Sequence, residues 1–229
     1  GTSVPLAGQQ GGSAAAAAQK QDAEYAKRIF DNTPDKRILT ELVDHLPVSA
    51  TVPSPLKFLG YVPGENNRIT YHKDIIAYYQ AIAKASPRVT LWEIGTSEEG
   101  RPAFAMAIAD EATIKSLGKY KQITAQLSDP RKLSDAQAKQ LIQTGKPIYY
   151  ATGSIHSGET GSPEMLTELA FRLAVEETPF IRQIRNNAIV VITPVSEVDG
   201  HERQVDNRRA TDAGQPAPGM MYWGKYVAH

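Results

Sequence analysis

The chain has 229 residues, and its 25 Lys and Arg balance its 25 Asp and Glu, so that the formal net charge is zero. This balance argues against a general electrostatic grip on nucleic acid or on an anionic membrane surface. Cysteine is absent, which excludes disulfides and thiolate metal sites. No apolar run approaches the ~18 residues that a membrane-spanning helix needs. We therefore expect no nucleic-acid partner and no membrane span.

Residues 1–67 are predicted to form a low-complexity and proline-rich lead-in. The first 20 residues are rich in Gly, Ala and Gln, and the chain begins at Gly1 instead of Met. An exported protein that has lost its signal peptide begins in this way, and so does a shortened chain. We expect a secreted or periplasmic protein. A short helix is predicted over 21–30, and the proline-rich stretch 33–67 is predicted to be loop-rich and to pack on the main domain.

The main domain, residues 68–229, is predicted to begin with a helix and a hairpin. Thr70 is a candidate N-cap for a helix that ends before Ser86 and Pro87. Strands are predicted over 89–95 and 103–109, and we expect a solvated turn between them. Further helices are predicted over 111–126 and 135–143.

A polar loop follows the apolar run that enters from Pro147 and ends at Gly153. The run is predicted to be a short buried strand. The loop presents His156 and Glu159, and a helix is expected directly after it, with Ser162 as N-cap and Pro163 at its first position. Strand, turn and helix in this order place His156 and Glu159 at the carboxyl end of a strand, where open α/β sheets bind ligands.

His156 and Glu159 belong to residue types that bind zinc, since a catalytic zinc takes three protein ligands, often two His and one Glu. The spacing His-x-x-Glu is a weak pattern by itself. The alternative is a polar loop with a surface His and with a Glu that the helix macrodipole favours. We therefore interpret the pair as candidate metal ligands because of the strand and helix that flank it.

Two more helices, 163–177 and 179–185, lead to the apolar run 188–192, which is typical of a parallel strand covered on both faces. A second polar turn, 194–200, follows this strand. Downstream, Arg209 and then Arg208 are candidate clamps for an oxyanion or substrate, because a guanidinium is always charged and presents a fork of donors. The alternative for both is a solvated surface arginine.

Four stretches, taken together and in order, resemble the zinc carboxypeptidases of the funnel-shaped α/β type, the family of pancreatic carboxypeptidase A. They are the helix-like 71–79, the stretch 94–102, which is similar to a Gly-x-Ser-x-Glu-Gly-Arg hairpin, the loop 153–164, and 190–200, which is similar to a strand with a Pro-x-x-Asn-x-Asp-Gly turn. The likeness covers about residues 68–229. It implies an α/β fold with a mixed, largely parallel central sheet flanked by helices.

The resemblance implies a metallocarboxypeptidase that uses Zn²⁺-activated water to remove C-terminal residues from peptide substrates. His156 and Glu159 would be zinc ligands, and an arginine, Arg209 or Arg208, would stabilise the oxyanion. The third ligand, a His, and the general-base Glu of the family come later than His229. We therefore expect a domain that is incomplete at the C-terminus, and a chain that binds zinc weakly and is inactive alone. His201 and His229 are the later histidines, for which polar or structural roles are the alternative.

Two departures from the family pattern leave alternatives open. Gly158 stands where digestive members carry an arginine, and the Asn of the second turn is replaced at Ser196 or Glu197. One alternative is a zinc amide hydrolase that acts on N-acyl amino acids or peptidoglycan peptides. Another is a non-catalytic relative that only binds. Because a partial domain exposes sheet edges, we also expect the chain to self-associate, and a well-behaved monomer in size exclusion would count against this.

Overall fold

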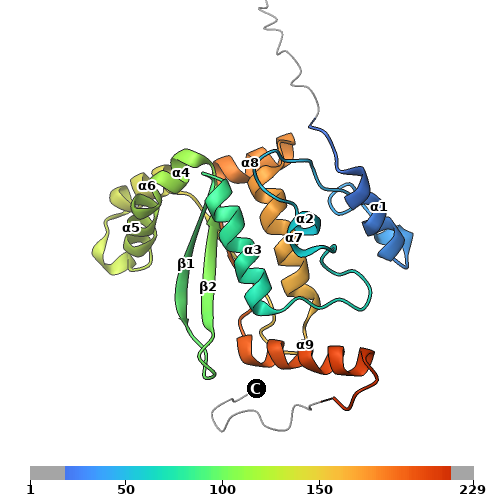
Figure 1. Cartoon of the computed structure of the whole chain (residues 1–229). Helices are drawn as coiled ribbons and strands as arrows, with labels where there is room; N and C mark the ends of the chain where they lie inside the picture. The colour runs from blue at the N-terminus through green and yellow to red at the C-terminus, as the bar shows by residue number, and fades with distance from the viewer. Residues whose placement is uncertain (1–18, 218–229) are drawn as a thin grey trace, which may run out of the picture.

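The computed structural model describes residues 19–217, which form a small sheet flanked by helices (Figure 1). Within this range, no helix is long and apolar enough to cross a membrane. The helices are α1 (Ala23–Asn32), α2 (Pro55–Leu59), α3 (His72–Ala85), α4 (Glu111–Lys115), α5 (Leu117–Leu127), α6 (Asp135–Thr144), α7 (Gly161–Val175), α8 (Pro179–Asn187) and α9 (Val198–Asp212), and the strands are β1 (Val89–Thr96), β2 (Pro102–Ile108), β3 (Ile148–Thr152) and β4 (Ile189–Thr193), with 3₁₀ turns at Lys36–Ile38 and Pro130–Lys132.

The four strands form one mixed sheet in the order β1-β2-β4-β3. The hairpin pair β1/β2 and the pair β2/β4 are antiparallel, and only β3/β4 is parallel. The predicted α/β fold and the parallel β3/β4 pair are confirmed, but the prediction of a largely parallel sheet is wrong. A tight turn joins β1 to β2 and so forces them antiparallel, whereas α7 and α8 provide the long crossover that a parallel pair requires.

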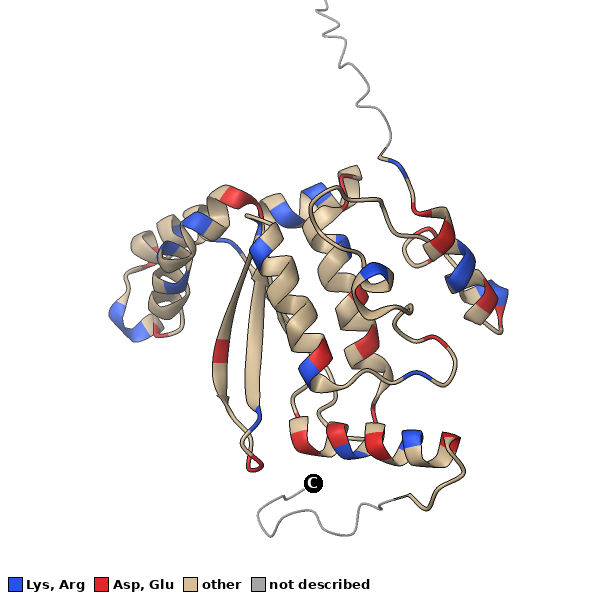
Figure 2. Cartoon of the chain, in the orientation of Figure 1, with Lys and Arg blue, Asp and Glu red and all other residues tan. Residues whose placement is uncertain are grey.

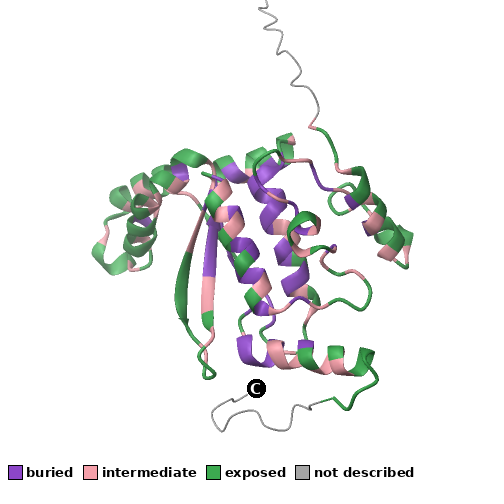
Figure 3. Ribbon diagram, in the orientation of Figure 1, coloured by how far each residue is buried: buried purple, intermediate pink, exposed green. Residues whose placement is uncertain are grey.

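The core lies between the sheet and the helices α3 and α7, whose inward faces are buried (Figure 3). Tyr79 and Phe171 are fully buried there, and Tyr79 Oη donates to Leu166 O at 3.0 Å. The proline-rich lead-in joins the same core, as expected, because Tyr25 and Leu46 are fully buried in it.

Strand β3 is an edge strand among the described residues, because it ends the strand order and pairs only with β4. Its Tyr149 and Tyr150 side chains are 66% and 55% exposed. The prediction that this apolar run is buried is therefore wrong. In contrast β4, which lies between β2 and β3, is buried as predicted.

Several helix boundaries also differ from the expectation. Thr70 does not cap α3, which begins after Tyr71 without a side-chain cap. Instead, Thr70 N and Oγ1 donate to the buried Glu164 carboxylate at 2.6 and 2.8 Å. Helix α7 begins at Gly161, so that Ser162 lies inside it and is not its N-cap. The predicted helix 111–126 is divided into α4 and α5 at Ser116.

Candidate metal centre

The ends of β3 and β4 are held together where the polar loop begins. Gly153 N donates to Thr193 O at 3.0 Å, and Ser196 N donates to Gly153 O at 2.8 Å. A Cβ on Gly153 would lie 2.4 Å from Pro194 O, so only glycine fits between the two backbones. The loop that carries His156 and the turn after β4 therefore start from one fixed point.

Ser154 then reverses the chain. It has a φ of 48°, a left-handed conformation that is uncommon for a residue with a side chain, and it is buried. Its N donates to Ser162 Oγ at 2.9 Å and its Oγ donates to His156 O at 3.2 Å. The carbonyl of Ser154 accepts a bond from Glu197 N at 2.9 Å. These bonds stabilise a strained turn that projects the following residues outward.

His156 and Glu159 lie side by side at the exposed tip of this loop. His156 Nδ1 lies 3.0 Å from Glu159 Oε1, and their side chains are 64% and 52% exposed. His156 N also donates to Glu159 Oε2 at 3.3 Å. The hydrogen bond from the His156 side chain, and then that from its backbone, lower the pKa of Glu159. The carboxylate is thus ionised at neutral pH, as a metal ligand has to be.

The donor set fits zinc in part. Two tetrahedral ligands at about 2.0–2.1 Å from zinc lie roughly 3.3 Å apart, close to the 3.0 Å between His156 Nδ1 and Glu159 Oε1. Between residues 19 and 217, however, no group of three or more His, Asp or Glu side chains could hold a metal. His201, a candidate third ligand, is fully buried, and its Nε2 bonds to Thr70 O at 2.8 Å. His229, the other candidate, and the stretch 221–229 lie outside the described residues.

The turn after β4 leads directly into α9, which the sequence did not predict. Glu197 caps this helix by accepting a bond from Gly200 N. Helix α9 lies next to the loop of His156 and Glu159, because a Cβ built on Gly158 would lie 3.8 Å from Gln204 Nε2. The loops after β3 and β4 therefore form one surface.

Asp199, in the first turn of α9, holds the tip of the β1/β2 hairpin. Its carboxylate accepts from Ser97 Oγ at 2.7 Å, from Glu99 N at 3.0 Å and from Arg101 Nη1 at 2.5 Å. Burial raises the pKa of Asp199, but these three bonds outweigh it, so that its pKa is lowered overall. The turn is solvated as expected, since residues 98–100 are exposed, but it is also tethered to a partner about a hundred residues away in sequence.

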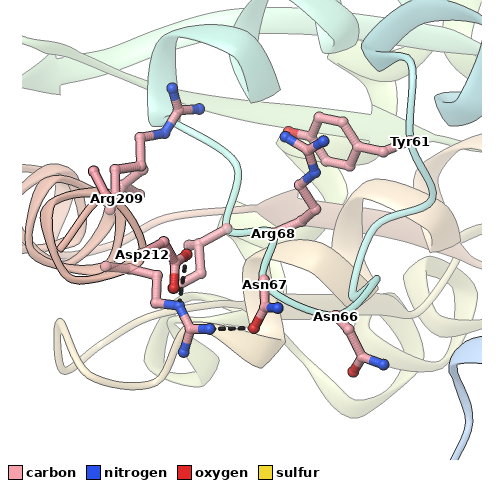
Figure 4. Close-up of a pocket in the computed structure, with 10 residues that line it drawn as sticks. Tyr61, Asn66, Asn67, Arg68, Arg209 and Asp212 are labelled. Atoms are coloured by element: carbon pink, nitrogen blue, oxygen red, sulfur yellow. Dashed lines mark hydrogen bonds and ion pairs between the residues drawn. The ribbon is translucent and has the colours of Figure 1, made fainter.

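Arg208 and Arg209 lie on α9, farther from its first turn. They line a cavity of about 630 Å³ between α9 and the segment that precedes α3 (Figure 4). Neither His156 nor Glu159 is among the described residues that line it. The structure thus brings the two candidate arginines together in one pocket and the two candidate ligands together in one loop. Both places lie along α9, since Gln204 of this helix is close to Gly158 of the loop.

A mixed sheet flanked by helices, with a His–Glu pair displayed beyond the carboxyl end of a strand, defines an α/β protein with a candidate metal-binding loop. Residues 75–219 match the family model described as zinc carboxypeptidase. Because the match covers more than half of the chain, this protein belongs to the zinc carboxypeptidase family.

Solved carboxypeptidase structures are also similar to this chain. The carboxypeptidase A from Helicoverpa armigera is 21% identical over 64% of this chain and 27% of its own, with a TM-score of 0.39. Bovine thrombin-activatable fibrinolysis inhibitor, in complex with tick carboxypeptidase inhibitor, is 14% identical over 62% of this chain and 36% of its own (TM-score 0.41). The metallo-carboxypeptidase from Burkholderia cenocepacia is 18% identical over 56% and 27% (TM-score 0.38).

The chain thus spans 27–36% of the length of these structures. No curated protein matches it significantly.

Proposed function

We propose that this chain is part of a zinc-dependent metallocarboxypeptidase that removes C-terminal residues from peptides. One observation carries the proposal: within the family match, His156 and Glu159 lie 3.0 Å apart in a loop fixed at the carboxyl end of β3. A carboxylate and an imidazole at this spacing suit a metal ion, and zinc would polarise water and the scissile carbonyl.

Each candidate residue of this chain would have a distinct role. His156 and Glu159 hold the metal, while Gly153 and Ser154 fix the loop through their bonds to the neighbouring turn. Arg209 and Arg208 supply positive charge for an oxyanion or for a substrate group. The third ligand and the general base would come from outside the described residues. Export to the periplasm or the exterior, and self-association of this chain through the exposed edge of β3, remain part of the proposal.

Zinc titration by calorimetry, together with metal analysis, tests the proposal on this chain and on the full-length product of its gene. The variant His156→Ala should abolish tight binding by the full-length product. His45→Ala is a matched control, because His45 also forms an imidazole–carboxylate pair, with Asp44, in the lead-in. We expect this chain alone to bind zinc weakly, since two ligands do not complete a first shell.

The two alternatives give different results. A full-length product that ignores zinc would contradict the proposal and favour a non-catalytic binding relative. If zinc binds, peptides with a free and with an amidated C-terminus distinguish the activities, because a carboxypeptidase cleaves only the free form. Cleavage of N-acyl amino acids instead would identify an amide hydrolase.

A further inference from the structure

The cavity beside Arg208 and Arg209 is formed by two segments that lie far apart in the sequence. One wall is the C-terminal half of α9, and the other is the segment 61–69, which precedes α3 (Figure 4). Its volume of about 630 Å³ lies within the roughly 300–1,000 Å³ that ligand sites occupy. The residues that line it are Tyr61, Asn66, Asn67, Arg68, Ile69, Val205, Arg208, Arg209, Asp212 and Ala213.

The charge of this lining is unbalanced. Its side chains include three arginines and a single carboxylate, that of Asp212. This carboxylate accepts a bond from Arg208 Nε at 3.0 Å, and Arg208 also donates to Asn67 Oδ1. Although charges of both signs alternate along α9 as a whole (Figure 2), the one acid in the cavity is therefore already engaged.

The other two guanidinium groups, those of Arg68 and Arg209, are held by aromatic rings instead of acids. Arg68 lies over the ring of Tyr61 at 5.5 Å, and Arg209 lies over the ring of Tyr71 at 4.3 Å. Within residues 19–217, the side chain of neither arginine forms a hydrogen bond or an ion pair. Stacking uses the face of a guanidinium and leaves the N–H donors at its edge available to a ligand.

Figure 4 shows Arg209 on α9 and Arg68 on the segment that precedes α3, so the two side chains come from different walls of the cavity. Each guanidinium can bind one carboxylate through both of its oxygens. The two arginines, with no acid paired to either, therefore suit a ligand that carries more than one carboxylate. The amide of Asn66 adds donors and acceptors on the same wall. The cavity is therefore chemically matched to a carboxylate-bearing ligand that is larger than a single ion.

We propose that this cavity is an anion subsite in which Arg68 and Arg209 bind the side-chain carboxylates of acidic peptides. Its position suits a peptide that is bound at the loop of His156 and Glu159, and this part of the inference rests on the proposed function. Gln204, which lies close to Gly158 of that loop, precedes Arg208 by four residues, or about 6 Å along α9. An extended peptide covers about 3.3 Å per residue, so a peptide of a few residues spans this distance.

Arg68 makes the proposal specific to this chain. It precedes the residues that match the family, which begin at 75, so the family assignment does not account for it. Arg68 is also far in sequence from His156 and Glu159. Because neither His156 nor Glu159 lines the cavity that Arg68 lines, the role of Arg68 can be tested by ligand binding without zinc and without catalysis.

The test is calorimetric titration of this chain, at low ionic strength, with acetylated and amidated tetra-glutamate. Tetra-glutamine in the same form tests whether charge is required, and inorganic phosphate tests whether a small oxyanion suffices. The variants are Arg68→Gln and Arg209→Gln. Arg131→Gln is the control for charge, because the Arg131 side chain is 85% exposed and pairs with Asp129 of its own turn, far from the cavity lining.

We expect tetra-glutamate to bind, tetra-glutamine not to bind, and each pocket variant to weaken binding about tenfold, since hydrogen bonds to charged groups are the strong ones. Arg131→Gln should change nothing. Absence of tetra-glutamate binding would overturn the proposal, and so would equal weakening by all three variants. Binding of phosphate without the peptide would overturn it as well. None of these results depends on zinc, so failure here leaves the proposed function intact.

Discussion

Asp199→Asn should detach the β1/β2 hairpin from α9, and the cost follows from the contacts of the carboxylate. Asn retains one oxygen for Ser97 and Arg101, but its amide nitrogen then faces Glu99 N–H, so that one bond is lost. The substitution also removes the charge–charge attraction between Asp199 and Arg101. We discount this loss because the Arg101 side chain is 34% exposed. Hydrogen bonds to charged groups contribute about 1.5–3 kcal/mol, so we expect a total loss of about 2–3 kcal/mol.

Thermal unfolding followed by circular dichroism measures this loss. For a chain of this length, about 1 kcal/mol shifts the Tm by about 2–4 °C, so Asp199→Asn should lower the Tm by about 4–12 °C. Asp206→Asn is the matched control on the same helix, because Asp206 is exposed and accepts one bond, from Tyr71 Oη at 2.7 Å. A Tm for Asp199→Asn within about 2 °C of the parent would refute the anchor. Equal losses in both variants would assign the effect to the charge of α9 instead.

Two other predictions concern the backbone junction and the buried histidines. Gly153→Ala should destabilise the chain by more than about 2 kcal/mol in the same assay, because the added Cβ would lie 2.4 Å from Pro194 O. The control Gly161→Ala should be neutral or slightly stabilising, because the space around its Cβ is open. Equal effects of the two variants would contradict the steric argument. The rings of His72 and His201 should titrate below the ordinary pKa of about 6.5 in an NMR titration, because burial lowers the pKa of both. Since the folded pKa values lie below the unfolded value, the stability that each neutral ring contributes is complete above about pH 6.5 and is lost as the pH falls toward the folded pKa. Ordinary titration curves would show that these rings are not held neutral by the fold.

Periodicity in the sequence was sufficient to find most of the elements near the metal loop. The hairpin, the crossover helices and the strand β4 lie within a few residues of their predicted bounds, because their apolar residues recur at the spacing of a helix or a strand. The run 147–153 shows the limit of this approach. An apolar strand looks the same whether it is central or at an edge, and only the strand order places β3 at the edge.

Helix α9 could not be predicted from periodicity, because it is polar nearly throughout and buries few apolar side chains, such as Val205. Its first turn is fixed by long-range bonds from Asp199 to the hairpin, and such partners leave no local pattern in a sequence. His156 and Glu159, in contrast, are three residues apart, so their proximity could be expected from the loop itself. The pocket of Arg208 and Arg209 required the fold, since its other wall comes from residues 61–69.

The burial of the lead-in has a practical consequence for the minimal folding unit. The family match begins at residue 75, yet Tyr25 Oη donates to Glu168 at 3.0 Å and Arg172 of α7 donates to His45 O. Recombinant boundaries chosen from the match alone would remove these partners and expose the apolar side of α7 to solvent. A protease that cuts within residues 21–67 should, for the same reason, destabilise the domain. Expression trials should therefore retain the chain from about residue 19 onward.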